Sequence, residues 1–404
     1  MRAQSAIGGL ILAALAMTAE AAEDRLTPLL RFVPPAALAG PQDAVSFVDL
    51  AAVRSVLADQ VSPTAMETWS EADRALATLM RATNLPPMLA DYAQNDGASG
   101  FAGMEAHLGF GWDDVERAIG FGTPPATTLV LAGTPRVTDA AAIGEALAAG
   151  GFAVEEREGH PFWWRLSDNA SDLASRDPSH PLRGAIGGSA RAGILSEAFV
   201  AAGNWAAIDA VLAQDAAAGT SPDLAALAHA LNQPVAEEGV LLQAYLIPGA
   251  VDLAPGAELA GRTDLDDEAL AALRERLLSG EGSGVPRYRA VAFGDRQEGD
   301  RAVAVVALLY DSEEAAQAAA EAIPAAMAAL QSTATSRPYT ELLPYAVAAQ
   351  VVHAGGGGRH LALITFSTEL APVEGGPLTV SPAPYRRLID MLYRRDLGFL
   401  APAH

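Results

Sequence analysis

The sequence contains no cysteine and no lysine, and each absence excludes whole classes of chemistry. Without cysteine the chain has no disulfide, no thiol nucleophile, no thiolate metal ligand and no lipidated N-terminal cysteine. Without lysine it cannot form a Schiff base, and it lacks the phosphate-binding lysine of Walker-type loops and the lysine of some serine acylases. All 26 basic residues are therefore arginines. A chain of this length must then be stabilised by its hydrophobic core.

Basic residues are scarce relative to acidic ones, at 26 against 49, so the formal net charge is −23. A surface this acidic repels phosphate backbones, and we expect no nucleic-acid partner. The charge favours solubility, and it also suits docking of a basic partner or of divalent cations. Hydrophobic residues make up 50% of the chain, which indicates a globular protein and not a disordered one.

The first 21 residues have the pattern of a Sec-type signal peptide. Arg2 is followed by a short apolar run over 7–17, and Ala19-Glu20-Ala21 matches the small-x-small cleavage site. The apolar run is shorter than the roughly 20 residues that span a bilayer. We therefore expect cleavage after Ala21, a periplasmic or secreted location and, because cysteine is absent, no lipoprotein anchor.

The order of the predicted elements indicates an α+β fold of two related modules, each a mainly antiparallel sheet packed against helices. Residues 126–166 and 301–367 both read strand, helix, strand, tight turn, strand, although they share little sequence, and coincidence is the alternative. The expected organisation is a signal peptide (1–21), a mostly helical lead-in (22–125), a first module (126–248), a helical connector (249–284) and a second module with a C-terminal amphipathic helix (285–404).

Individual segments give more specific predictions. Residues 44–48 are predicted to form a strand, after which Asp49 is placed to cap a helix. Apolar spacing predicts one helix across 64–82, and acidic residues at its start favour a short helix over 112–119. A helix over 138–149, capped by Thr138 or Asp139, should stop at the glycines that follow it.

No catalytic motif is present. The Ser189 region lacks the last glycine of the nucleophile elbow, and none of the seven histidines has a metal-ligand spacing such as HExxH. Glu156, Glu158 and His160 share one strand face, but that alternation is normal for a solvated hairpin. We therefore assign no catalytic, cofactor-binding or metal-binding residue and expect no cofactor.

Two segments are candidates for a binding surface. Trp163 and Trp164 are neighbours in a strand and must point to opposite faces, so one belongs to the core and the other lies under the 167–183 loop or on a binding surface, with His160 beside them. Gly355 to Gly358 joins two strands, which favours a hairpin tip over a phosphate-binding loop. Arg359 and His360 follow this tip and are available to contact a partner.

The C-terminal helix is the basic exception in an acidic chain. Its apolar residues alternate with four arginines, namely Arg386, Arg387, Arg394 and Arg395. Such a helix suits an anionic membrane surface or a partner protein. The alternative is that its apolar stripe docks on the protein's own body.

The segment Phe152–Trp163 combines a charged strand, a Gly-His-Pro turn and an aromatic strand after an alanine-rich helix that ends in glycine. Together with Asp49–Arg54 it resembles segments of uncharacterised exported bacterial proteins and lipoproteins with repeated α+β modules, over roughly residues 44–210. This chain departs from the lipoprotein members because it lacks cysteine. The family has no settled activity, so the resemblance implies a fold and an address but no catalytic residues.

These observations favour an exported, non-catalytic α+β protein that binds a protein partner or a small ligand. The first alternative is a peripheral membrane or complex-associated accessory protein that docks through its C-terminal helix. The second is a cofactor-free hydrolase, whose mark would be a deep pocket with a Ser–His–carboxylate or paired-carboxylate geometry.

Overall fold

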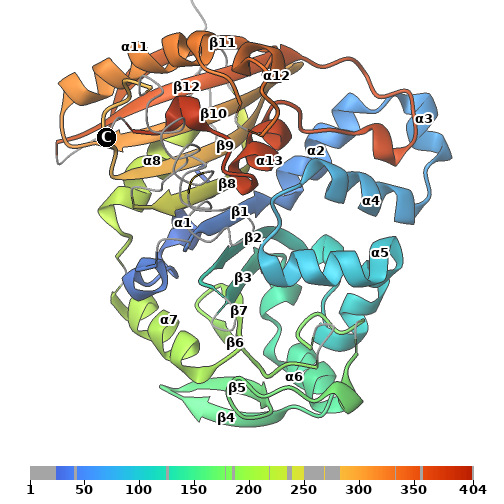
Figure 1. Ribbon diagram of the computed structural model, residues 1–404. Coiled ribbons are helices and arrows are strands. Elements are labelled where there is room, and N and C mark those ends of the chain that lie inside the picture. Colours follow the sequence, from blue (N-terminus) through green and yellow to red (C-terminus); the bar gives the residue numbers. More distant parts are fainter. Residues whose placement is uncertain are drawn as a thin grey trace, which may run out of the picture.

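The computed structural model (Figure 1) describes residues 24–40, 43–123, 127–177, 179–183, 187–217, 219–233, 239–249, 268, 283–332, 334–354 and 358–402, without the side chains of 71, 91 and 93–102. The predicted signal peptide, most of the predicted connector and Gly355–Gly357 lie outside the described residues. Within them the fold is mixed α+β and is built on one large antiparallel sheet.

The sheet has twelve strands in the order β11-β12-β10-β9-β8-β1-β2-β3-β7-β6-β5-β4, and every neighbouring pair is antiparallel. The strands are β1 (Val45–Asp49), β2 (Val115–Phe121), β3 (Thr128–Gly133), β4 (Ala153–Arg157), β5 (His160–Arg165), β6 (Ala190–Leu195), β7 (Ala198–Ala202), β8 (Val240–Pro248), β9 (Ala290–Glu298), β10 (Arg301–Tyr310), β11 (Ala346–Ala354) and β12 (Arg359–Glu369).

Helices cover both faces of this sheet. They are α1 (Thr27–Leu30), α2 (Leu50–Gln60), α3 (Pro63–Thr68), α4 (Glu71–Arg81), α5 (Pro87–Leu108), α6 (Ala140–Ala149), α7 (Trp205–Ala217), α8 (Pro222–Asn232), α11 (Glu313–Ala329), α12 (Tyr339–Leu342) and α13 (Tyr385–Tyr393). Short 3-10 turns lie at Pro35–Leu38, Trp112–Asp114, Pro135–Thr138, Leu173–Ser175, Pro377–Thr379 and Gly398–Leu400.

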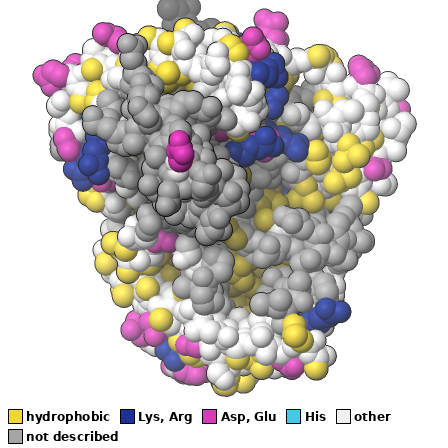
Figure 2. Space-filling view, viewed as in Figure 1, with side chains coloured by type: hydrophobic (Ala, Val, Ile, Leu, Met, Phe, Trp, Pro, Cys, Tyr) yellow, Lys and Arg dark blue, Asp and Glu magenta, His cyan; other side chains and the backbone are white. Residues whose placement is uncertain are grey.

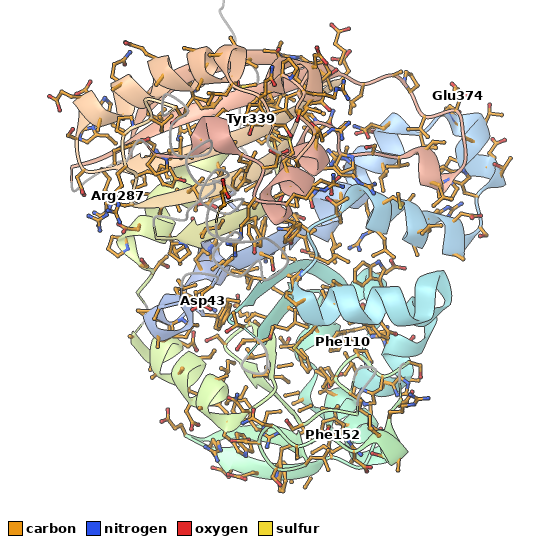
Figure 3. All side chains as sticks on the ribbon, in the orientation of Figure 1. Asp43, Phe110, Phe152, Arg287, Tyr339 and Glu374 are labelled. Atoms are coloured by element: carbon orange, nitrogen blue, oxygen red, sulfur yellow. The ribbon has the colours of Figure 1, made fainter. Side chains whose placement is uncertain are left out.

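The central strands are buried on both faces because each face packs against helices, whereas the edge strands β4 and β11 are largely exposed. In β10, Val303 and Val305 belong to a core shared with α1, α7 and α8, whereas Val306 and Leu308 face the opposite way. That opposite face carries two cores, one under α2, α4, α5 and α6 and the other under α11 and α13. Figure 3 marks Phe110 in the first of these two cores and Tyr339 in the second.

The sheet divides between β1 and β8, which pair through Val45–Val48. On one side β1, β2 and β3 follow one another outward, and on the other side β8, β9 and β10 do the same. The segments predicted to match, 126–166 and 301–367, therefore begin at corresponding strands. They end differently, because β12 pairs directly with β10 whereas the β6–β7 hairpin lies between β3 and β5.

The helix predicted over 112–119 is wrong, since residues 115–121 form β2. The acidic residues make only one 3-10 turn, in which Asp114 accepts hydrogen bonds from the Gly111 amide at 2.8 Å and the Thr134 hydroxyl at 2.9 Å. The segment after it is inserted between β1 and β3, and the burial of its apolar residues on both faces overrides the local helical signal.

The single helix predicted over 64–82 is divided into α3 and α4. Trp69 ends the first helix in an extended conformation, and Ser70 begins the second through a reciprocal capping box with Asp73. The caps predicted for two other helices are confirmed, because Asp49 accepts from the Ala52 amide and Asp139 accepts from the Ala142 amide.

Candidate functional site

The main candidate site is a cleft of about 1150 Å³ between α2, α4, the end of α5 and the 3-10 turn at Trp112. Figure 2 shows hydrophobic side chains exposed on this side of the molecule, over the region where Figure 1 places α3 and α4. The break at Trp69–Ser70 creates it in part, because the two short helices diverge there and leave side chains of both helices in its wall.

The floor of the cleft is apolar. Leu57, Trp69, Ala77 and Trp112 line it and are all buried in the core under α2, α4 and α5. Met66 and two alanines of α4 continue the apolar wall toward the surface. A cleft with an apolar floor that includes aromatic side chains is typical of a binding pocket for a small organic molecule.

Charged side chains lie at the mouth of the cleft. Arg136 is fixed by two ion pairs, at 2.5 Å from Glu105 and 3.2 Å from Asp114. The hydrogen bond to Glu105 raises the pKa of Arg136, so this cation is already balanced. These three residues pair with one another at the rim of the cleft, so they contribute little uncompensated charge that could attract a ligand.

Two other arginines are less completely paired. Arg54 donates one bond to the Val115 carbonyl at 2.8 Å, while its buried Nη1 has no hydrogen-bond partner among the described residues. Burial lowers the pKa of Arg54. Arg74 is exposed and forms no ion pair with any side chain that the structure describes. Asp113, also exposed, forms no ion pair within 4.0 Å with a described side chain, but its charge acts on Arg54 and partly offsets the effect of burial.

The predicted aromatic surface lies elsewhere, at β5. Trp163 belongs to the core, whereas Trp164 and His160 are half-buried. The ring of Trp205, from α7, lies nearby and is covered by the guanidinium groups of Arg157 at 3.8 Å and Arg191 at 5.3 Å. These contacts make the outer face of this hairpin a packed surface of arginine and tryptophan.

The other predicted binding residues lie far from β5. Arg359 forms an ion pair with Asp223 of α8 at 2.9 Å, and His360 faces His353 across the β11–β12 hairpin. Eight strands separate β12 from β5 in the sheet order, so the structure does not bring Trp163 and Trp164 together with Arg359 and His360. They are two separate surfaces.

The C-terminal helix α13 packs its apolar face on the body of the protein. Tyr385, Leu388 and Ile389 are buried in the core beneath α11, and Arg386, Arg387 and Arg394 are exposed, while Arg395 is half-buried. Among the residues that the structure describes, no helix is both long enough and apolar enough to cross a membrane.

A separate polar cluster surrounds the buried side chain of His180. The imidazole is 1% exposed, accepts a hydrogen bond at Nδ1 from the Leu182 amide and lies between the rings of His107 at 4.6 Å and Phe152 at 5.5 Å. Burial, together with the nearby His107 and Arg183, lowers the pKa of His180 to about 3. The ring is therefore neutral at physiological pH.

The sequence alone did not indicate the cleft. Its lining comes from elements between residues 54 and 136, and the only local signal was the apolar spacing of Met66 and Trp69, which equally fits an ordinary core helix. His353 was also missed, although it and His360 are equally distant from the centre of the predicted hairpin tip.

No family model matches this sequence, and no curated protein matches it either. Among solved structures, crystal form I of TP0453 is similar over 90% of this chain and 97% of that chain, with a TM-score of 0.33 and 9% sequence identity. Crystal form III of the same protein is similar over 84% and 95%, with the same TM-score and identity. A TM-score this low carries no argument about the fold or the function of this chain.

Proposed function

We propose that the protein is an exported, non-catalytic binding protein whose cleft takes an amphipathic small molecule. The observation that carries this proposal is the cleft of about 1150 Å³, with two tryptophans in its floor and arginines at its mouth. The signal-peptide pattern of residues 1–21 supports a periplasmic or secreted location.

The chemistry of the cleft favours a ligand with an apolar body and an anionic head. The apolar body would lie against Leu57, Trp69 and Trp112, where its burial supplies most of the binding free energy. The head would lie near Arg74, whose charge no described side chain neutralises. Asp113 at the same mouth would repel an anionic head, and the repulsion would grow with the charge of that head.

The sheet also supports a repeated architecture of two related modules. β1, β2 and β3 run outward from the central pair as β8, β9 and β10 do, and the helix that follows β3 corresponds to α11 after β10. In this arrangement the first module would extend back from residue 126 to include β1, β2 and the helices α2 to α5 between them, and the cleft would belong to it.

The alternative in which α13 docks on a membrane or a partner has less support, because Leu388 and Ile389 are already buried in the protein's own core. For the hydrolase alternative, the described residues include a serine–histidine contact in which Ser179 Oγ lies 3.4 Å from His107 Nε2. Asp177 accepts a bond from Ser179 itself at 2.6 Å, whereas a catalytic triad places the carboxylate on the far side of the histidine.

Probe binding tests the proposal directly. The full mature chain is titrated with anilinonaphthalenesulfonate, which combines an aromatic body with a sulfonate, and in parallel with the neutral dye Nile red. Ala75→Trp should abolish saturable binding of both probes, because the new ring occupies the half-buried wall of the cleft. Arg74→Gln should weaken the anionic probe about 2- to 5-fold, as one exposed ion pair predicts, and leave Nile red unchanged.

The matched control is Arg386→Gln, which removes an exposed arginine outside the cleft. Far-UV circular dichroism and urea midpoints establish that each variant is folded, since loosely packed proteins also bind such dyes. Undiminished binding of both probes to a folded Ala75→Trp chain would overturn the proposal.

A further inference from the structure

A second site, independent of the cleft, lies where the β11–β12 hairpin meets the start of α11. His353 on β11 and His360 on β12 are direct cross-strand partners, and Glu313 is in the first turn of α11. One nitrogen or oxygen atom from each of the three residues lies within 4.8 Å of the other two. None of these residues lines the cleft.

The two imidazoles face each other closely. His353 Nδ1 is 3.1 Å from His360 Nδ1, and the ring planes are nearly perpendicular at 83°. The other nitrogen of His353, Nε2, lies 3.8 Å from Glu313 Oε1. His353 thus faces the two residues with different ring nitrogens, and the set with one ligand atom from each residue is the one that lies within 4.8 Å.

The separation of the two histidine nitrogens matches that of two ligands on one metal ion, and a small movement of the exposed Glu313 side chain would bring its carboxylate to the same ion. Two ligand atoms at about 2.0 Å from a tetrahedral zinc ion lie about 3.3 Å apart, close to the distance between the two Nδ1 atoms. Imidazole with carboxylate is the donor set that suits zinc and its neighbours among the transition metals, whereas Mg²⁺ and Ca²⁺ prefer oxygen ligands alone. Because the chain has no cysteine, nitrogen and oxygen donors are the only strong ligands it can offer.

The position of the cluster keeps its ligands close together. The two histidines lie opposite each other on the paired strands β11 and β12, which fix their backbone positions. Ser312 caps α11 directly before Glu313. All three side chains are at least partly accessible to solvent, so an ion can reach them. Glu314 adds a second carboxylate whose charge interacts with His360, which raises the local attraction for cations.

We propose that Glu313, His353 and His360 form a binding site for a zinc-class divalent transition-metal ion. Three protein ligands leave one tetrahedral position for water or for a group of a bound partner. The competing description is a surface histidine pair joined by an ordinary hydrogen bond, which would bind no metal at low concentration.

The test uses the full mature chain without an affinity tag, titrated with Zn²⁺ by isothermal calorimetry at pH 7.5. We expect one ion per chain, no competition from excess Mg²⁺ or Ca²⁺, and at least a tenfold loss of affinity in each of His353→Ala and His360→Gln. Glu313→Gln should also weaken binding. The control His229→Gln removes an exposed histidine of α8 outside the cluster and should leave binding unchanged.

Co²⁺ provides a second, spectroscopic readout. Its visible d–d bands become intense in tetrahedral nitrogen and oxygen coordination, so the wild type and His229→Gln should develop them and His353→Ala should not. Binding of Zn²⁺ that is equally tight in a folded His353→Ala/His360→Gln chain, or the absence of saturable binding to the wild type, would overturn the proposal. Neither result would bear on the cleft.

Discussion

The most stringent prediction concerns the buried ion pair between Arg81 and Asp295, which joins the two halves of the molecule. Arg81 ends α4, Asp295 lies on β9, and both side chains are fully buried. The guanidinium makes two hydrogen bonds to the carboxylate, one of them from Nη2 at 3.3 Å. Gln243 donates to Asp295 at 2.8 Å and to the Arg81 carbonyl at 2.9 Å.

The expected cost of breaking this pair follows from its burial. Asp295→Asn keeps the size of the side chain and an acceptor for Gln243 but leaves the guanidinium of Arg81 buried without a counter-charge. Removing one partner of such a pair costs about 3–5 kcal/mol. Arg81→Met should cost a similar amount, because it leaves the carboxylate of Asp295 with only the amide of Gln243.

The double variant allows the interaction energy between the two side chains to be separated from their interactions with other residues. In Arg81→Met/Asp295→Asn no charge is buried, the asparagine still accepts from Gln243, and the methionine fills the space of the arginine stem. We expect a loss of about 1–3 kcal/mol, the scale of the hydrogen bonds that are removed. The coupling energy of the cycle should therefore be at least about 2 kcal/mol.

Urea unfolding measures these values, and the chain contains a convenient pair of probes. All five tryptophans lie between residues 69 and 205, so their fluorescence reports the half that contains β1, whereas far-UV circular dichroism reports both halves. The two transitions should coincide in the wild type and separate in the single variants. If the stability lost in the double variant equals the sum of the losses in the two single variants, the argument is refuted.

Three further predictions test local interactions. The pKa of His180 falls from about 6.5 in the unfolded chain to about 3 in the fold, so the free energy of unfolding is highest above pH 6.5 and decreases as the pH falls below it. The expected decrease is about 1 kcal/mol between pH 7 and pH 5.5. Urea midpoints should show this loss in the wild type and not in His180→Leu. Asp139→Ala, which removes the cap of α6, should cost about 1 kcal/mol by thermal unfolding, and a change within error would contradict the capping role. Gly193→Ala places a methyl group 2.5 Å from the ring of Phe162 and should cost about 1–3 kcal/mol, whereas Gly376→Ala, with open space around it, should be neutral.

Local chemistry predicted much of the secondary structure. The short runs of β-forming apolar residues at 44–48 and 301–310 and the capping carboxylates of Asp49 and Asp139 act over a few residues and are read directly from the sequence. The helix predicted over 112–119 failed because its local signal was opposed by pairing to strands on both sides, which no window of neighbouring residues contains.

The sites were harder to predict because they depend on distant parts of the chain. Trp69 and Trp112 meet in one cleft only after α2, α4 and the turn before β2 are packed together. His353 and His360 lie closer in sequence, and their symmetry about a hairpin turn predicts a cross-strand pair once the strands are placed. Glu313 joins them only because α11 returns over the same edge of the sheet.

A β-bulge in β8 places Leu242 on the same face as Gln243, the third member of the buried ion-pair cluster. From Ala244 onward, successive side chains of β8 point alternately into the cores on the two faces of the sheet. If this alternation continued backward without interruption, Leu242 would lie on the face opposite to Gln243. The register with β9 shifts between Leu241 and Gln243, and Leu242 instead enters the core beneath α2 while Gln243 reaches Arg81 and Asp295. A bulge places two neighbouring side chains on one face. The extra residue thus lets one strand complete an apolar core and satisfy a buried charge pair, which a strict alternation of two could not do.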